Sequence, residues 1–227
     1  VGVLPTTEPY TAAPYNKPVL GETAGETIDP SLLTVTGNDA IVDWVFIEVR
    51  NSTTPSTIVA TKRAVIQRDG DIKAANGGDL VFTSLPAGSY NVSLKHRNHL
   101  GVMASAALTI NPCSFTSLDF TTSPLWVKPG EINGPARMFG PVATLWSSDA
   151  NTNKNAKYNG LSNDKQVVLN AVGVGTANNV LSPVYRTEDL NMDGKVKYNN
   201  VDNDRNVIAN TVGVSTPNNI VNQHTPN

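Results

Sequence analysis

Charge, aromatic residues and cysteine are all scarce in this sequence of 227 residues. Charged residues make up 16% of the chain, against roughly 25% in a typical soluble domain. The net charge of −2 provides no broad basic surface for nucleic acid or anionic lipid. No apolar run approaches the roughly 18 residues that a membrane-spanning helix requires. We therefore expect neither a nucleic-acid partner nor a membrane span.

The only cysteine is Cys113, which excludes a disulfide within the chain. We expect a buried, unreactive thiol, because free cysteines are usually buried and no basic residue lies next to this one. His224, close to the last residue, is expected to be exposed. The chain opens at Val1 without a signal-peptide pattern, so we expect a processed, mature protein.

Four segments differ in composition. Residues 1–30 are rich in proline and threonine, which excludes a helix and indicates an extended arm. The arm could be a linker, or it could lie along a sheet or on a neighbouring subunit. Residues 31–122 form a β domain, residues 123–146 an irregular connector, and residues 147–227 a duplicated domain. Trp126 and Trp146 are expected to pin the connector to one of the domains.

The β domain consists of short apolar runs separated by turn residues. In the first run Val42, Trp44 and Phe46 alternate along one face, and Glu48 continues the series. Strands are predicted over residues 41–50, 57–68, 80–85, 89–96, 103–110 and 115–120. This spacing, with no helical pattern between the runs, predicts a mainly β fold: an antiparallel immunoglobulin- or prealbumin-like β-sandwich, followed by a small α-helical domain.

A duplication carries the chemistry of the chain. Residues 149–183 recur at residues 189–223, and the matched positions include acidic, amide and glycine residues. A repeat of this length corresponds to one supersecondary unit, so we expect the two copies to form a small two-fold domain.

The second copy opens with oxygen-bearing side chains at alternate positions, Asp189, Asn191 and Asp193. Gly194 permits a sharp turn, and Lys195 can offer its carbonyl oxygen. This is the pattern of a calcium loop, because Ca²⁺ takes six to eight oxygen ligands. The loop contains no histidine or cysteine, which disfavours zinc and copper.

The usual acidic residue at the twelfth position is missing, since Gly160 and Asn200 stand there. Four residues later, Asp164 and Asp204 precede apolar residues at helical spacing that continue to Val172 and Val212. We therefore expect each aspartate to begin a helix and also to close its loop as a metal ligand.

The first copy has fewer carboxylates. It offers Asp149, Asn151, Asn153 and the carbonyl of Asn155, and Lys154 replaces the glycine of the turn. We expect two calcium ions, with the site at residues 189–204 the stronger. The first loop could also hold no ion.

These motifs resemble the dockerin-like modules that end many secreted Bacteroidetes proteins. The resemblance rests on the repeated strings Asp189–Gly194, Lys157–Gly160 and Asn163-Asp164, and it extends to the β domain through Asp43–Val45, Leu85–Gly88 and His96–Met103. It covers most of residues 40–223. It implies a β-sandwich followed by a calcium-stabilised helical pair, displayed on the cell surface or secreted.

Catalysis is not expected, because the sequence contains no nucleophile motif and no phosphate loop. His96 and His99 could bind a metal or a sugar, or their imidazoles could bond to the backbone. Two functions remain open. The chain could be an extracellular structural or assembly module, binding a protein partner or further copies of itself in an oligomer or filament. Alternatively, it could be a glycan-binding or adhesin module.

Overall fold

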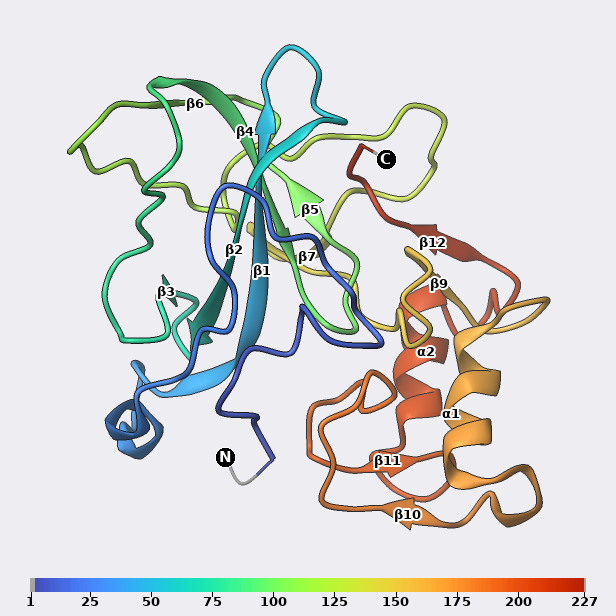
Figure 1. Cartoon of the computed structure of the whole chain (residues 1–227). Helices are drawn as coiled ribbons and strands as arrows, with labels where there is room; N and C mark the ends of the chain where they lie inside the picture. Colours follow the sequence, from blue (N-terminus) through green and yellow to red (C-terminus); the bar gives the residue numbers. More distant parts are fainter. Residues whose placement is uncertain (1–2, 227) are drawn as a thin grey trace.

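The computed structural model describes residues 3–226, and its fold is mainly antiparallel β with two α-helices. Figure 1 shows the sheet on one side of the molecule and the helices on the other. The main sheet contains β1 (Ile41–Asn51), β2 (Ile58–Gln67), β3 (Ile72–Lys73), β4 (Gly88–Lys95), β5 (Val102–Met103) and β6 (Leu108–Ile110). Its strand order is β3-β2-β1-β4-β5, and β6 also pairs with β4.

The central strand β1 is buried on both faces. Trp44 and Phe46 pack on one side of the sheet, and Val45 and Ile47 pack on the other. The predicted partner Val42 is 45% exposed, because the register between β1 and β2 shifts between Ile41 and Asp43. A bulge of this kind ends the alternation of side chains across the sheet.

The N-terminal arm covers the first face of the sheet. Tyr10 is fully buried, and its hydroxyl donates to the carbonyl of Trp44 at 2.8 Å. The indole of Trp44 in turn donates to the carbonyl of Pro5 at 2.8 Å. Figure 1 shows the arm crossing the sheet, followed by the 3-10 helix η1 (Pro30–Thr34). The arm therefore packs on the sheet of its own chain, which is one of the three arrangements that the sequence left open.

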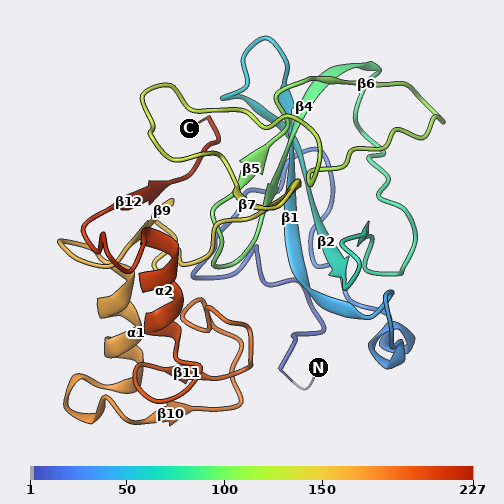
Figure 2. The same cartoon turned by 180° about the vertical axis from the view of Figure 1, so that it is seen from behind.

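The opposite face is covered by the connector (Figure 2). Ala136, Phe120 and Leu125 pack there with Val45 and Ile47. The connector contains a hairpin of β7 (Arg137–Phe139) and β8 (Val142–Thr144). Trp146 packs against a small cluster with Leu100, Ala156 and Val221, and its indole donates to the carbonyl of Gly134 at 2.9 Å.

Two predicted strands do not form. Residues 80–85 and 115–120 are irregular, and the predicted strand 103–110 is divided between β5 and β6. Leu80, Phe82 and Phe120 still pack against the core. Their apolar pattern therefore reports burial, but a strand also needs a neighbouring strand with which to exchange backbone hydrogen bonds.

Two single-residue predictions are wrong. Cys113 is exposed, in a turn where its φ is 57°. His224 is fully buried, and its Nδ1 accepts from the Lys128 amide at 3.0 Å. The C-terminal segment that carries it is held against the connector, so its nearness to the chain end does not expose it.

The helical part has an internal two-fold relation. It contains β9 (Asn155–Lys157), α1 (Asp164–Val172), the 3-10 helix η2 (Val174–Thr176), β10 (Val180–Leu181), β11 (Val196–Lys197), α2 (Asp204–Val212) and β12 (Ile220–Asn222). β9 of the first copy pairs with β12 of the second, and β11 of the second pairs with β10 of the first. The copies therefore exchange their terminal strands.

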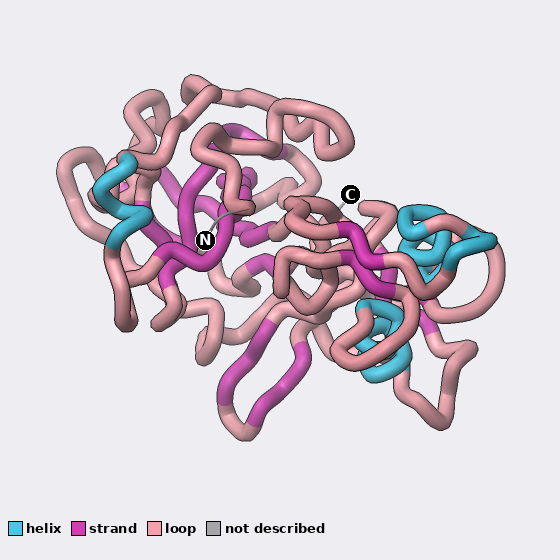
Figure 3. Tube along the Cα trace, turned by 90° about the horizontal axis from the view of Figure 1, so that it is seen from below, coloured by secondary structure: helices cyan, strands magenta, loops and turns pink. Residues whose placement is uncertain are grey.

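The two helices pack against each other over a shared core. Val168 and Val172 of α1 pack there with Ile208 of α2 and Val196 of β11, and Val212 is also buried. Seen from below, the α-helices and the main sheet occupy different sides of the molecule (Figure 3). Within residues 3–226, no helix is long and apolar enough to cross a membrane.

Candidate functional site

Each predicted closing aspartate is the first residue of its helix. Asn163 and Asn203 are the N-caps, and their side chains accept from the amides of Gln166 at 2.8 Å and Asn206 at 2.9 Å. With this cap bond made by the asparagine, the following aspartate is available for other contacts. Asp164 and Asp204 are both fully buried and turn back toward their loops.

In the second loop, the carboxylate of Asp204 accepts three backbone amides. Oδ1 accepts from Leu190 at 2.7 Å and from Asn191 at 3.4 Å, and Oδ2 accepts from Lys197 at 2.8 Å. The side chain of Asp204 thus joins the start of the loop and strand β11 to helix α2.

At the other end of the same loop, two side-chain oxygens meet at one amide. The Asp193 amide donates to Asp189 Oδ1 and to Asn191 Oδ1, both at 3.1 Å. Asp189 Oδ2 accepts from the Gly194 amide at 3.1 Å. Asp193 Oδ1 accepts from the Lys195 amide at 2.9 Å. The predicted ligands Asp189 and Asn191 therefore have their side-chain oxygens close together at the turn.

The first loop has the same geometry despite its different residues. Asp149 accepts from the amides of Asn153 at 2.9 Å and Lys154 at 3.1 Å, and Asn151 Oδ1 also accepts from Asn153 at 3.2 Å. Asp164 accepts from residues 150, 151 and 157. Lys154 has a φ of 71° where Gly194 has 76°, so the lysine adopts the turn at some conformational cost.

Burial shifts the titration of these carboxyl groups. Loss of solvent raises the pKa of Asp149 to about 6, of Asp164 to about 7 and of Asp204 to about 6, and it also raises the pKa of Asp189. Amide hydrogen bonds oppose the shift in each case. The charge of Asp149 adds to the rise at Asp164, and the charge of Asp189 adds to that at Asp204. In each loop the charge of the first buried acid therefore disfavours the ionised form of the second.

The remaining predicted ligands differ between the loops. Asp193 Oδ2 forms an ion pair with Lys197 Nζ at 2.8 Å, and in the first loop Lys157 Nζ donates to the carbonyl of Leu161 at 3.2 Å. Asn155 Oδ1 is buried without a hydrogen-bond partner. Within the described residues, no group of three or more His, Cys, Asp and Glu side chains is arranged to hold a metal. A metal would therefore depend on amide and carbonyl oxygens as well as on the carboxylates.

The β domain contacts both loops, and no sequence pattern predicts this contact. Arg97 Nη2 lies 3.5 Å from Asp189 Oδ2, and Arg97 Nε donates to Asp43 Oδ2 at 2.9 Å. The carbonyl of Asn98 accepts the amides of Ser148 and Asp149, and its Nδ2 donates to the carbonyl of Asp189 at 2.6 Å. The polar residues 96–99 are a sequence signal at this position, but their histidines suggest a metal or sugar site and not a contact with the loops.

Those histidines bond to side chains. His96 Nε2 lies 3.1 Å from Asp43 Oδ2, and its Nδ1 lies 2.9 Å from His99 Nδ1. His99 Nδ1 is also 2.8 Å from Asn98 Oδ1. The pair thus supports Asp43 and Asn98 at the boundary between the sheet and the helices.

Comparison of the chain with protein families, with curated proteins and with solved structures returns no match.

Proposed function

We propose that this chain is an extracellular, calcium-binding structural module of a bacterial surface or secreted protein. Its C-terminal part would be a dockerin-like module that mediates protein–protein or subunit contacts, and the preceding block would be a β-sandwich of the immunoglobulin or prealbumin type. We propose no catalytic role.

One observation carries the proposal. In each loop two buried aspartates, fifteen positions apart, lie against the same short stretch of backbone, Asp149 with Asp164 and Asp189 with Asp204. Burying two carboxylates close together is unfavourable unless a cation or proton compensates them. A divalent ion would offset both charges at once, and the duplicated geometry supports the same explanation for both loops.

The donor set suits a hard cation. Asp189, Asn191, Asp193 and Asp204, with the carbonyl of Lys195, would hold the ion in the second loop. Asp149, Asn151, Asn153 and Asp164, with the carbonyl of Asn155, would hold it in the first. Calcium would supply charge neutralisation and hold the ends of each loop together.

We propose that the second site is the stronger, because it has three carboxylates against two. Two cationic side chains lower the affinity of this site for a metal ion, because Arg97 lies near Asp189 and Lys197 forms an ion pair with Asp193. Arg97 already has a closer carboxylate partner in Asp43, whose Oδ2 lies 2.9 Å from Arg97 Nε. The ion pair between Lys197 and Asp193 is partly exposed to solvent, where such a pair contributes little.

Exposed apolar side chains favour an assembly role. They occur in pairs related by the internal repeat: Leu161 and Val201, Val174 and Val214, Val180 and Ile220. Contiguous exposed apolar patches mark protein-binding surfaces, and we propose that these repeated residues contribute to one. A glycan-binding role has less support, because Trp44 and Phe46 on the face of β1 are covered by the arm.

Calorimetric titration of the metal-free protein with calcium tests the proposal. We expect two binding phases of unequal affinity and a higher melting temperature with calcium, because an ion bound only by the native state must stabilise it. Asp204→Ala should weaken the tighter phase by at least tenfold to a hundredfold. The matched control is Asn200→Ala, at the position where a standard loop would close.

An unchanged melting temperature in saturating calcium would exclude the proposed metal role. Equal losses from the Asp204 and Asn200 variants would show that Asp204 is not the closing ligand.

A further inference from the structure

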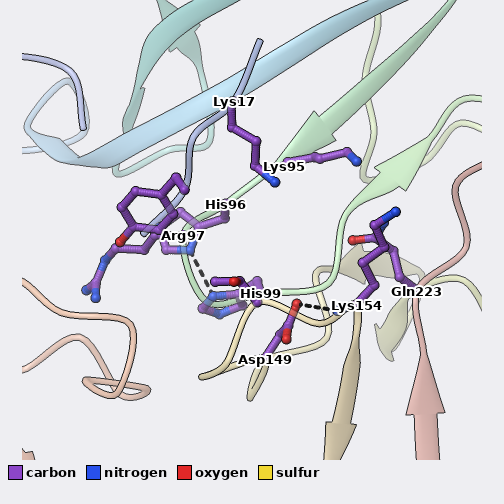
Figure 4. A pocket seen from close by; sticks show the side chains of 10 residues that line it. Lys17, Lys95, His96, Arg97, His99, Asp149, Lys154 and Gln223 are labelled. Atoms are coloured by element: carbon purple, nitrogen blue, oxygen red, sulfur yellow. Dashed lines mark hydrogen bonds between the residues drawn. The ribbon is translucent and has the colours of Figure 1, made fainter. Parts of the chain in front are cut away.

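A second polar site lies where four segments of the chain meet (Figure 4). The arm contributes Lys17, the end of β4 contributes Lys95, the first loop contributes Thr152 and Lys154, and the C-terminal segment contributes Gln223. In Figure 4, Lys17 and Lys95 approach the pocket from one side, and His99 and Asp149 from the other. Among the residues that line this pocket, only Asp149 is also a proposed calcium ligand.

Positive charge dominates the pocket lining. Four lining residues are Lys or Arg and one is Asp. The carboxylate of Asp149 is directed to the amides of Asn153 and Lys154. Lys95 is 8% exposed, and it has an ion pair with Glu48 at 3.2 Å. Burial lowers the pKa of Lys95 to about 8, and the positive charge of Lys17 contributes to this lowering.

The lysine of the arm is held in place by the sheet. The amide of Lys17 donates to the carbonyl of Tyr10 at 2.7 Å. Arg63 Nη2 donates to the carbonyls of Lys17 at 3.4 Å and Pro18 at 2.9 Å. Arg63 is fully buried, so these bonds anchor the backbone that carries Lys17. A fixed backbone at this position reduces the freedom that Lys17 loses when it binds a ligand.

We propose that this pocket binds a tetrahedral oxyanion, a sulfate or phosphate group. Convergent ammonium groups with a neighbouring hydroxyl and amide are suited to such a group, since charge-assisted hydrogen bonds to its oxygens are strong. The centre of a water molecule can move through only about 20 Å³ of the pocket. This space suits one small ionic group, whereas sites for larger organic ligands occupy about 300 Å³ or more. The group could be a free ion or the charged end of a larger molecule such as a sulfated sugar.

The full-length protein, loaded with calcium at pH 7, is titrated calorimetrically with sodium sulfate at constant ionic strength. We expect saturable binding at one site that sodium chloride and sodium acetate do not reproduce. Lys17→Gln should weaken sulfate binding about tenfold to a hundredfold, as expected for loss of one charge-assisted bond. Lys17→Arg should restore part of the affinity, and Thr152→Val, which removes a hydroxyl from the pocket lining, should weaken binding several-fold.

Lys73→Gln is the matched control, because it removes a lysine of β3 that pairs with Asp79 far from the pocket. Equal losses from the Lys17 and Lys73 variants, or sulfate binding no tighter than acetate binding, would overturn the proposal. Glucose 6-sulfate separates the two sources of the group. Binding as tight as that of free sulfate assigns the pocket to esters on a glycan, and binding of the free ion alone assigns it to an inorganic oxyanion. Calcium binding is measured on the same variants, so loss of one site is distinguishable from loss of the other.

Discussion

Asp43 is buried at the boundary between the sheet and the helices. It lies 3.1 Å from His96 Nε2 and 2.9 Å from Arg97 Nε, and it accepts from the hydroxyl of Tyr185 at 2.7 Å. Burial alone would raise its pKa, but His96 and Arg97 outweigh burial and hold the pKa well below its ordinary value. Asp43 therefore stabilises the fold in its ionised form, and this contribution is lost only as the pH falls below about 4.

Removal of the Tyr185 hydroxyl should show how much this contact stabilises the fold. We expect Tyr185→Phe to lower the free energy of unfolding by about 1.5–3 kcal/mol, as for other hydrogen bonds to charged groups. Urea denaturation measures the change. Tyr90→Phe is the control, because its hydroxyl bonds to the carbonyl of Pro86 at an exposed position. Equal effects from the two variants would contradict the role of Asp43.

The carboxylates of the loops shift in the opposite direction, which predicts a pH dependence. Their raised folded-state pKa values, about 6 for Asp149 and Asp204 and about 7 for Asp164, exceed the unfolded value of about 3.9. Without metal, their contribution to stability is greatest below about pH 4 and is lost as the pH rises to about 7.

Calcium competes with protons for the same oxygens. We therefore expect its stabilising effect on the melting temperature to be small at pH 5 and larger at pH 7.5. Melting scans with and without calcium at the two pH values measure it, with magnesium as the comparison ion. A calcium effect that is the same at both pH values would argue against these aspartates as ligands.

At the scale of elements, the reciprocal strand exchange connects each loop to the other copy. Val221 on β12 lies beside Ala156 on β9, and Leu181 on β10 lies beside Val196 on β11. Loop 149–164 therefore depends on the tail of the second copy, and loop 189–204 depends on the tail of the first.

We expect Val221→Asn to weaken calcium binding mainly at the first loop, and Leu181→Asn to weaken it mainly at the second. Each substitution places an amide among apolar side chains beside the strand that completes the loop. Amide NMR signals of Gly160 and Gly194 report the two loops separately during a calcium titration. Each variant serves as the control for the other. An effect on the loop of the variant's own copy would contradict the reciprocal arrangement.

The boundaries of these elements could be predicted to different degrees. Both helices begin and end at the predicted residues, because an Asn-Asp start, a regular apolar spacing and Gly173 or Gly213 at the end are local signals. The strands at residues 80–85 and 115–120 failed, because their apolar residues find core contacts without a partner strand. The local pattern predicts some core residues, such as Phe82 and Phe120, but it does not predict strand pairing.

At the scale of the whole molecule, Asn98 joins the sheet to both loops. Its buried side chain and carbonyl bond to residues 148, 149 and 189. We expect the wild type to melt in one calorimetric transition in calcium, and Asn98→Ala to separate it into two, because the substitution removes the side-chain bond between the parts. Asn76→Ala, in an exposed turn, is the control. A single transition in both variants would show that other contacts couple the parts.

The repeated apolar pairs predict self-association. We expect the protein in calcium to sediment as an oligomer at high concentration, and the double variant Leu161→Asp with Val201→Asp to sediment as a monomer. Val81→Asp, an exposed apolar residue outside the helical part, is the control. If the wild type remains monomeric at every concentration, the chain does not associate with itself. The partner would then be a different protein.

The sequence alone determined the repeat, its two oxygen-rich loops and the helices that follow them, because these depend on residues close together in the chain. Only the tertiary structure decided that the copies exchange strands, that the arm covers its own sheet, and that Arg97 and Asn98 reach the loops. It also brought Lys17 and Lys95 to one pocket. These contacts join residues distant in sequence, and packing and charge in three dimensions determine them, whereas local propensity does not.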